Sequence, residues 1–484
     1  MTRSSRTTRF LIGCIAFLMA FAAVAEDPIA LGSRRELFVD DFLIGGMDGV
    51  ALKLYEPRPA EAVLHFDKPW EGRYCGYVTV FQDGTIYRMY YRGLPQAGKD
   101  GSNAEVSCYA ESRDGLEFTK PNLGLFEVAG TSDNNVILAD SAPFSHNFAP
   151  FLDTRPGVPF EMRYKALAGT SKSGLVAFVS GDGVRWRTMQ EEPVITEGAF
   201  DSQNVAFWSE HEGSYCAYFR TWSEGDFGGF RWVSRSTSED FLNWTAPVEM
   251  DKGDAPWEHI YTNQTISYDR APHIYIAIAA RFMPGRRVVS PEEAAKLGVE
   301  GTYSGDCSDN VLMTSRGGNR YTRTFMEAFL KPGIGFENWT SRTNYPVRGV
   351  VATSDTEMSC YIQHNYGQPT GYIRRYAMRY DGFASVNAPY AGGEFVTKPL
   401  TFSGSGLYLN FATSAAGSLR VEIQDTDGKP LDGFALDDSA EIIGNMIDRA
   451  VSWKGSPDIG ALAGQPVRLR FVMKDADLYA IQFR

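Results

Sequence analysis

A short phrase recurs along the middle of the chain and constrains its fold more than any other feature. Its copies are Ser112-Arg113-Asp114-Gly115-Leu116-Glu117-Phe118, Ser180-Gly181-Asp182-Gly183-Val184-Arg185-Trp186, the looser 238–244 and the worn 315–321 and 379–383. Each follows a run of alternating β-formers, and Asp-Gly favours a tight turn with positive φ. Five copies about 58 to 77 residues apart predict five sheets of about four strands each, the signature of a β-propeller.

The rest of the chain predicts an all-β protein with two folded parts. Alternating strands without the repeat phrase follow a change of character near residue 388, so we expect a five-bladed β-propeller over 26–388 and a C-terminal β-sandwich over 389–484. Only 291–297 has helical character. The stretch Arg35–Asp40 is expected to supply the strand that closes the ring, so that no sheet edge stays open.

The first 25 residues predict a secretory signal peptide. Basic residues (Arg3, Arg6 and Arg9) precede an apolar run over 10–23, and Ala23-Val24-Ala25 forms an A-x-A cleavage site. The apolar run is too short for a transmembrane helix. The prediction is a secreted or periplasmic protein with no membrane span, and the sequence does not indicate its oligomeric state.

Charge and composition narrow the partners. The net charge of −12 becomes more negative once the basic leader is removed, which argues against nucleic acid. A carbohydrate fits better, either neutral or held by a local basic patch if it is acidic. The 24 Tyr, 31 Phe and 9 Trp suit stacking on sugar faces and equally suit packing between sheets.

Five cysteines follow the leader, and they predict no metal centre. Their number is odd and none has C-x-x-C or zinc-finger spacing; they are Cys75, Cys108, Cys216, Cys307 and Cys360. We expect small buried residues, with one disulfide as the alternative. No cofactor is predicted, although a structural or catalytic divalent ion in the central funnel is left open.

The repeat, the expected blades and the appended sandwich resemble the five-bladed propeller glycoside hydrolases. These form the invertase, arabinanase and levansucrase superfamily, including families 32, 43 and 117. The two clearest phrases look like the S-x-D-G-x-x-W turns of those enzymes, and 204–208 followed by 215–220 looks like one of their inner strand pairs. The resemblance covers 35–388 and implies carbohydrate cleavage where the inner strands enter the funnel.

The catalytic motifs of those families are missing. They place an acidic triad at the starts of the inner strands of the first three blades, but this chain has no W-M-N-D-P-N-G, R-D-P or E-C motif. The R-D-P aspartate position falls near His146 in blade two and Gln203 in blade three. The resemblance therefore implies the place of the chemistry and not its residues.

Glycoside hydrolysis needs two carboxyl groups across the scissile bond, one of them held protonated. Acids near the expected strand starts are the catalytic candidates: Glu71, Asp201, Glu258 and Glu357. Trp70 and Trp257 precede two of them and could form sugar platforms or apolar walls that raise a carboxyl pKa. The alternative for each acid is a solvated loop carboxylate.

Other side chains at the strand starts suit sugar binding. His259 is a candidate to assist the acids, and the remaining candidates are His146, Asn147, Gln203, Asn204, Asn263, Arg73, Arg281 and Arg342. Histidine could transfer a proton or join a carboxylate around a metal ion. The amides could bind hydroxyls or simply bond strand ends around the channel, and the arginines could recognise a carboxylate or sulfate.

The sequence as a whole predicts an exported glycosidase. It would cleave a plant or algal poly- or oligosaccharide by carboxylate acid–base catalysis in the funnel. A non-catalytic carbohydrate-binding propeller has the same features without an acid pair. A polysaccharide lyase would instead use His as a base and Arg to neutralise a uronate.

Overall fold

The computed structural model describes residues 27–484, and the predicted leader lies outside them. The described chain is all-β, with one short α-helix, α1 (Pro291–Lys296). The 3-10 helices are η1 (Phe144–His146), η2 (Phe160–Met162), η3 (Gly301–Tyr303), η4 (Phe336–Trp339), η5 (Leu436–Asp438) and η6 (Gly460–Leu462). No helix within 27–484 has the length and apolar character needed to cross a bilayer.

Successive strands form five groups of four, which we call sheets 1 to 5. Sheet 1 contains β6 (Gly76–Asp83), β7 (Ile86–Gly93), β8 (Val106–Ser112) and β9 (Val136–Leu138). Sheet 2 contains β10 (Ala149–Leu152), β11 (Tyr164–Thr170), β12 (Gly174–Ser180) and β13 (Arg187–Thr188). Sheet 3 contains β14 (Val205–Ser209), β15 (Ser214–Trp222), β16 (Arg231–Ser238) and β17 (Val248–Glu249).

The last two sheets depart from this simple meander. In sheet 4, β18 (His259–Thr262) and β19 (Thr265–Tyr268) both pair with β20 (Ala271–Met283), which pairs with β21 (Cys307–Ser315). Sheet 5 contains β22 (Tyr345–Ala352), β23 (Glu357–His364), β24 (Tyr372–Arg379) and, as its last strand, β5 (Arg58–His65). A single parallel pair, Arg348 with Thr79, joins sheet 5 to sheet 1.

The first strands of these sheets contact one another in a closed circle, from β6 through β10, β14, β19 and β22 back to β6. Their N-terminal ends therefore gather at one mouth of the circle, which we call the N-mouth, and their C-terminal ends gather at the C-mouth. Since the strands within each sheet are antiparallel, the second strand ends and the third begins at the N-mouth as well.

The first three repeat phrases form the turns that the sequence predicts. Ser112 Oγ accepts a hydrogen bond from the Gly115 amide at 2.9 Å, and Asp114 Oδ1 accepts one from the Leu116 amide at 2.8 Å. Gly115 has φ of +74°, which explains the glycine at this position. The equivalent aspartates 182 and 240 accept the same backbone bonds, so these carboxylates serve the turns.

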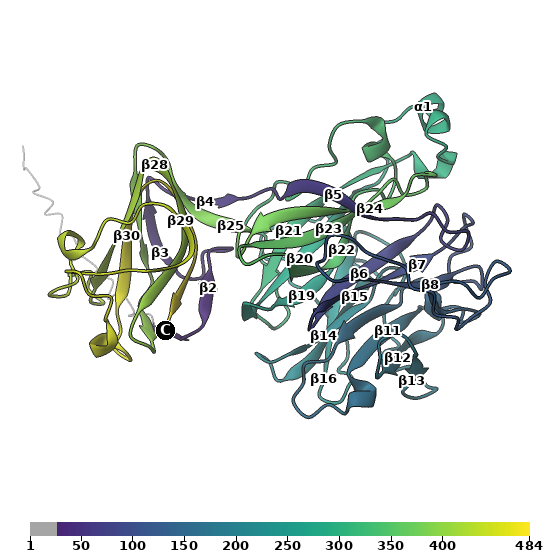
Figure 1. Ribbon diagram of the computed structural model, residues 1–484, viewed down its shortest axis with the longest axis horizontal. Coiled ribbons are helices and arrows are strands. Elements are labelled where there is room, and N and C mark those ends of the chain that lie inside the picture. Colours follow the sequence, from purple (N-terminus) through teal and green to yellow (C-terminus); the bar gives the residue numbers. More distant parts are fainter. Residues whose placement is uncertain (1–26) are drawn as a thin grey trace, which may run out of the picture.

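The remaining strands form a second unit, built from both ends of the chain. From the N-terminus come β1 (Ile29–Gly32), β2 (Arg35–Leu37), β3 (Ile44–Asp48) and β4 (Ala51–Leu54). After sheet 5 come β25 (Ala384–Ala388), β26 (Gly393–Thr397), β27 (Leu400–Phe402), β28 (Leu407–Gln424), β29 (Asn445–Ala450) and β30 (Arg468–Phe483). Figure 1 shows this unit beside sheets 1 to 5, with β4 and β25 running between them.

The predicted ring-closing strand needs correction. Residues 35–37 pair with β30, whereas β5 completes sheet 5. The physical reason is that the side chains after Arg35 alternate between two cores. Phe38 packs in the core of the second unit, and Leu37 and Val39 pack with residues of sheets 4 and 5. The segment therefore lies between the two units and holds them together.

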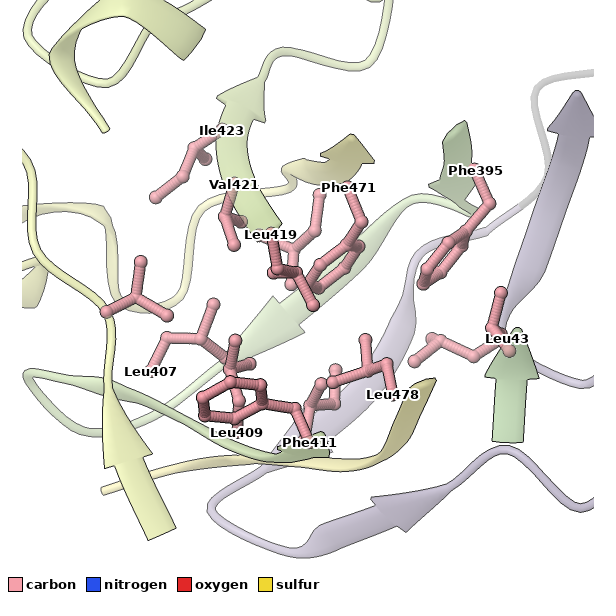
Figure 2. Close-up of a cluster of buried hydrophobic side chains, with 14 of the residues drawn as sticks. Leu43, Phe395, Leu407, Leu409, Phe411, Leu419, Val421, Ile423, Phe471 and Leu478 are labelled. Atoms are coloured by element: carbon pink, nitrogen blue, oxygen red, sulfur yellow. The ribbon is translucent and has the colours of Figure 1, made fainter. Parts of the chain in front are cut away.

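The core of the second unit comes mainly from its long strands (Figure 2). Leu419, Val421 and Ile423 of β28 are fully buried at alternate positions, as expected for a strand with one face on a core. Phe471 of β30 stacks on Phe395 of β26 with ring centroids 4.7 Å apart. All five cysteines within 27–484 are free and buried, which agrees with the prediction of small core residues.

Candidate functional site

A cluster of arginine and tyrosine side chains lies at the N-mouth. Tyr77 stands near the start of β6, Arg220 near the end of β15, Arg231 at the start of β16 and Tyr261 in β18. Arg342 lies in the loop shortly before β22. Because first-strand starts, second-strand ends and third-strand starts share this mouth, residues from separate sheets meet there. We call these five residues the mouth cluster.

Tyr261 is the centre of the mouth cluster. The guanidinium carbons of Arg220, Arg231 and Arg342 lie 4.6, 5.5 and 5.6 Å from the centre of its ring. Tyr345 packs on the same ring at 4.9 Å. Stacking on a ring stabilises a guanidinium while leaving its N–H edge free to donate, so the cluster can hold several cations in one place.

The backbone of this mouth is strained. Tyr77, Phe200 and Arg342 have φ of +52°, +51° and +58°, a region that bulky residues other than glycine rarely adopt. Tyr77 is the second residue of β6, and Phe200 and Arg342 lie in the loops that lead into β14 and β22. Strained backbone conformations of this kind persist only where the surrounding structure imposes them, and they are common at functional sites.

Asp201 is the ion-paired carboxylate of the site. It accepts hydrogen bonds from Arg220 Nη1 at 3.1 and 3.3 Å, and Tyr77 donates to its main-chain oxygen at 3.2 Å. The Asp201 side chain is 38% exposed, whereas that of Arg220 is 1% exposed. The Asp201 carboxylate is therefore open to solvent on one side and bound to a buried arginine on the other. It lies at the strand start where the sequence predicts it.

Asp306 is a second carboxylate of the same mouth, and the sequence analysis missed it. It directly precedes β21, and the pairing of Cys307 with Met283 places it at the N-mouth. Burial raises the pKa of Asp306, against the opposing effects of Ser341, Arg342 and Arg231. Its Oδ1 atom is buried without a hydrogen-bond partner in the described chain. Its surroundings therefore favour the protonated form more than those of a free carboxyl group do.

His146 lies in a buried polar cluster beside Tyr77. Its Nδ1 atom is 2.9 Å from Glu105 Oε1 and 3.2 Å from Arg92 Nη1. Glu105 is fully buried, so the natural arrangement has Nδ1–H donating to its carboxylate. Nε2 makes no hydrogen bond with residues 27–484, and the ring lies edge-on to Tyr77 at 5.6 Å. The ring is thus held in place through Nδ1, and Nε2 remains available to a ligand.

The same cluster has the spacing of a metal site. Ligand atoms of Asp100, Glu105 and His146 lie within 4.8 Å of one another. However, Arg92 Nη1 contacts all three, at 3.2, 3.3 and 3.2 Å. A guanidinium of the chain itself therefore supplies the positive charge that these groups need.

His259 accepts a main-chain hydrogen bond beside the mouth cluster. Its Nδ1 atom accepts from the main-chain N–H of Arg231 at 3.1 Å, so the proton of the neutral ring is on Nε2. Burial first, and then the charges of Arg231 and Arg220, lower the pKa of His259. Trp257 is 37% exposed and stacks on Phe230 at 5.9 Å, and Phe230 packs on His259 at 4.9 Å. These aromatic residues form a ledge beside the mouth cluster.

Three of the expected residues in the segment before β6 contact other parts of the chain. The Glu71 carboxylate is fully buried and accepts from Tyr91 at 2.6 Å and from Lys120 at 2.8 Å. The Trp70 indole is buried and donates to Asn135 at 2.9 Å. Arg73 donates to the Gly298 carbonyl at 2.9 Å, which ties this segment to the excursion that carries α1.

Two further acids are held by arginines that are not part of the mouth cluster. Glu258 pairs with Arg281 at 3.0 Å and with Arg323 at 2.7 Å, and Arg281 also pairs with Asp309. Glu357 begins the second strand of sheet 5 and so lies at the C-mouth, where it pairs with Arg375 and Arg58. Glu357 therefore lies at the opposite mouth from Asp201.

The amide side chains predicted at the strand starts bond the first strands to one another below the mouth cluster. Gln203 donates to Thr79 Oγ1 at 2.7 Å and accepts from Gln264 at 2.8 Å, so it joins sheets 1, 3 and 4. Asn147, Gln203, Asn204 and Asn263 are all buried. Asn147 bonds the main chain at Gly169 and Phe200. Asn204 alone of these four leaves both amide atoms without a partner among the described residues.

We found no protein-family model and no curated protein that matches the sequence. Among solved structures, the chain is similar to a glycoside hydrolase (11% identity, TM-score 0.43, 66% of this chain and 92% of that chain covered). It is also similar to an N-acetylgalactosamine deacetylase from F. plautii in complex with blood group B trisaccharide (11%, 0.42, 69% and 96%). A third is a glycosyl hydrolase from Bacteroides ovatus (13%, 0.39, 70% and 96%). Glycoside hydrolases are thus among the solved structures that the chain resembles.

Proposed function

We propose that sheets 1 to 5 are the blades of a five-bladed β-propeller, that the second unit is a β-sandwich, and that the protein is an exported glycoside hydrolase. Its substrate would be a fragment of a plant or algal polysaccharide, bound at the N-mouth. The closed circle of first strands supports the propeller, and the abundance of aromatic and hydrogen-bonding groups at one mouth supports sugar binding.

One observation carries the proposed reaction: the N-mouth holds two carboxyl groups in opposite environments. Asp306 has a raised pKa because it is buried, whereas Asp201 is partly exposed and paired with Arg220. Both act electrostatically on the same guanidinium, that of Arg231. A pair of acids whose surroundings differ in this way is the arrangement that glycosidases use for acid and base.

In the proposed mechanism Asp306 donates its proton to the glycosidic oxygen as the bond to the anomeric carbon breaks. Asp201 either attacks the anomeric carbon or removes a proton from the attacking water, and the separation of the two carboxyl groups across the bound sugar decides which. His259 Nε2–H donates to a sugar oxygen, and Trp257 supports a sugar face beside it.

Substitution of the two acids tests this mechanism. Asp306→Asn and Asp201→Asn should each lower kcat/KM on a panel of aryl glycosides and oligosaccharides by about 10² or more, because each removes proton transfer or nucleophilic attack. Asp254→Asn, which changes an exposed acid in the loop before β18, is the matched control. Full activity in both Asp306→Asn and Asp201→Asn would refute the assignment.

The acids that the sequence analysis proposed belong in the same series. Glu71→Gln, Glu258→Gln and Glu357→Gln remove carboxylates that are already paired with Lys120, with Arg281 and Arg323, and with Arg375 and Arg58. If one of these variants loses turnover while keeping its thermal stability, that residue replaces Asp201 or Asp306 in the mechanism.

The His146–Glu105 contact favours a second candidate function, a polysaccharide lyase. Nε2 would take the proton at C5 of a uronate, the C4–O bond would break and a C4–C5 double bond would form, and the resulting Nε2–H would return the proton to the leaving oxygen. Glu105 would stabilise the imidazolium that results. Oligosaccharides that contain a 4-linked uronate separate the two reactions, because on these substrates only elimination gives an unsaturated product that absorbs in the ultraviolet.

A further inference from the structure

We propose that Arg231 and Arg342 form the subsite for the charged group, a carboxylate or a sulfate ester, of an acidic sugar. This rests on the proposed function in that the ligand is a glycan, and it names the class of glycan. The net charge of the chain is −12, so a site for an anion has to be made locally. The N-mouth provides it.

These two arginines differ from their neighbours in having no counterion. Four other arginines at or near this mouth each pair with an acid: Arg92 with Glu105, Arg220 with Asp201, Arg281 with Asp309 and Arg323 with Glu258. Within 27–484, the side chains of Arg231 and Arg342 make neither an ion pair nor a hydrogen bond. Half-buried charges without a partner are costly, and an oxyanion of a ligand would compensate both.

Aromatic rings hold the two guanidinium groups in place without using their N–H groups. Arg231 lies 4.5 Å from the centre of the Trp222 ring and 4.9 Å from that of Phe282. The guanidinium carbon of Arg342 lies 5.3 Å from the centre of the Tyr303 ring. Arg231 and Arg342 both also lie against the ring of Tyr261. A stacked guanidinium still presents its donor edge, which matches the two oxygens of a carboxylate or sulfate.

The atoms around this subsite also lack partners. Arg231 Nε and the Tyr345 hydroxyl are buried and make no hydrogen bond to a described residue. The nearby acid, Asp306, forms no ion pair with a described residue, and burial acts to raise its pKa. Arg342 keeps its left-handed backbone at φ of +58°. The arrangement is therefore complete only when a ligand brings the negative charge and the acceptors.

Matched pairs of ligands test the subsite. Calorimetry would compare oligogalacturonides with their carboxyl-reduced forms, and sulfated galactan oligosaccharides with their desulfated forms. We expect at least one charged ligand to bind about tenfold or more tightly than its neutral counterpart, since charge-assisted hydrogen bonds are roughly twice as strong as neutral ones. The pair that shows the preference identifies the charged group as carboxylate or sulfate.

Variants then assign the preference to the two arginines. Arg231→Gln and Arg342→Gln should each reduce it about tenfold, and Arg342→Lys, which keeps the charge but not the planar edge, should retain part of it. Arg187→Gln, at an exposed position of β13, removes one charge far from the N-mouth and should leave it unchanged. Circular dichroism and Tm of each variant show that the fold is intact.

The outcomes separate this inference from the proposed reaction. Equal binding of charged and neutral ligands, no binding of any charged ligand, or a preference that survives both Gln substitutions overturns the subsite. Release of reducing ends is measured on the same ligands. Selective binding without cleavage supports the subsite and refutes the glycosidase, whereas cleavage without charge preference supports the glycosidase and refutes the subsite.

Discussion

At the scale of single residues, the environment of Asp306 sets an expected pH dependence. Burial raises its pKa, while Arg342 and Arg231 act to lower it. As the general acid Asp306 must be protonated, so activity should fall as pH rises through this raised pKa. Removing Arg342 as Arg342→Gln removes a charge that lowers the pKa, and the alkaline limb of the kcat profile should therefore move to higher pH.

The measurement is kcat against pH for wild type and Arg342→Gln, with Arg187→Gln as the charge-matched control. This role for Asp306 would be contradicted if the alkaline limb of Arg342→Gln moved to lower pH. It would also be contradicted if Asp306→Asn kept the alkaline limb of the wild type. The profile separates the proton donor from binding, because loss of an anion contact alone lowers affinity without moving the midpoint in kcat.

The residues at the N-mouth show what a sequence could and could not predict. Asp201, His259 and Arg342 were expected from their places at strand starts, and the structure brings them to this mouth. The contacts of Glu71 could not be foreseen, since its partner Lys120 is 49 residues away. Nothing local to Glu71 distinguishes a buried ion pair from a catalytic acid.

At the scale of secondary-structure elements, the missed residues follow from strand direction. A four-stranded antiparallel group brings the start of its first strand, the end of its second and the start of its third to one mouth. The candidates predicted from the sequence lie near expected first-strand starts, whereas Arg231 stands at the start of β16 and Asp306 before β21. Counting strands from each repeat turn would have found both.

The same rule explains where Glu357 lies. It begins β23, the second strand of sheet 5, and second strands begin at the C-mouth. The repeat turns themselves were predictable because their chemistry is local. Although burial acts to raise it, hydrogen bonds from Asn243, Leu242 and Ser238 lower the pKa of Asp240 to about 2. Contacts within seven residues define such a turn, whereas β5 had to be identified across some 300 residues of chain.

At the scale of the whole molecule, the last repeat copy joins the two units. Asp381 is fully buried and accepts hydrogen bonds from Arg35 at 3.1 Å, Tyr268 at 2.8 Å and Asn410 at 2.9 Å. Arg270 pairs with it at 3.2 Å. Arg35 belongs to β2 and Asn410 to β28 of the second unit, whereas Tyr268 belongs to sheet 4. One carboxylate therefore bonds residues from both units.

Asp381→Ala should weaken the molecule as a whole and uncouple its units. It leaves the buried guanidinium of Arg35 with only the partly exposed Asp448 as a counterion, and breaking a buried pair costs about 3–5 kcal/mol. Scanning calorimetry should show a lower Tm and a single transition that divides into two. Asp133→Ala, at an exposed position, should change stability by no more than about 0.5 kcal/mol. An undivided transition at the wild-type Tm would mean that apolar packing of Leu37, Phe38 and Val39 joins the units without this carboxylate.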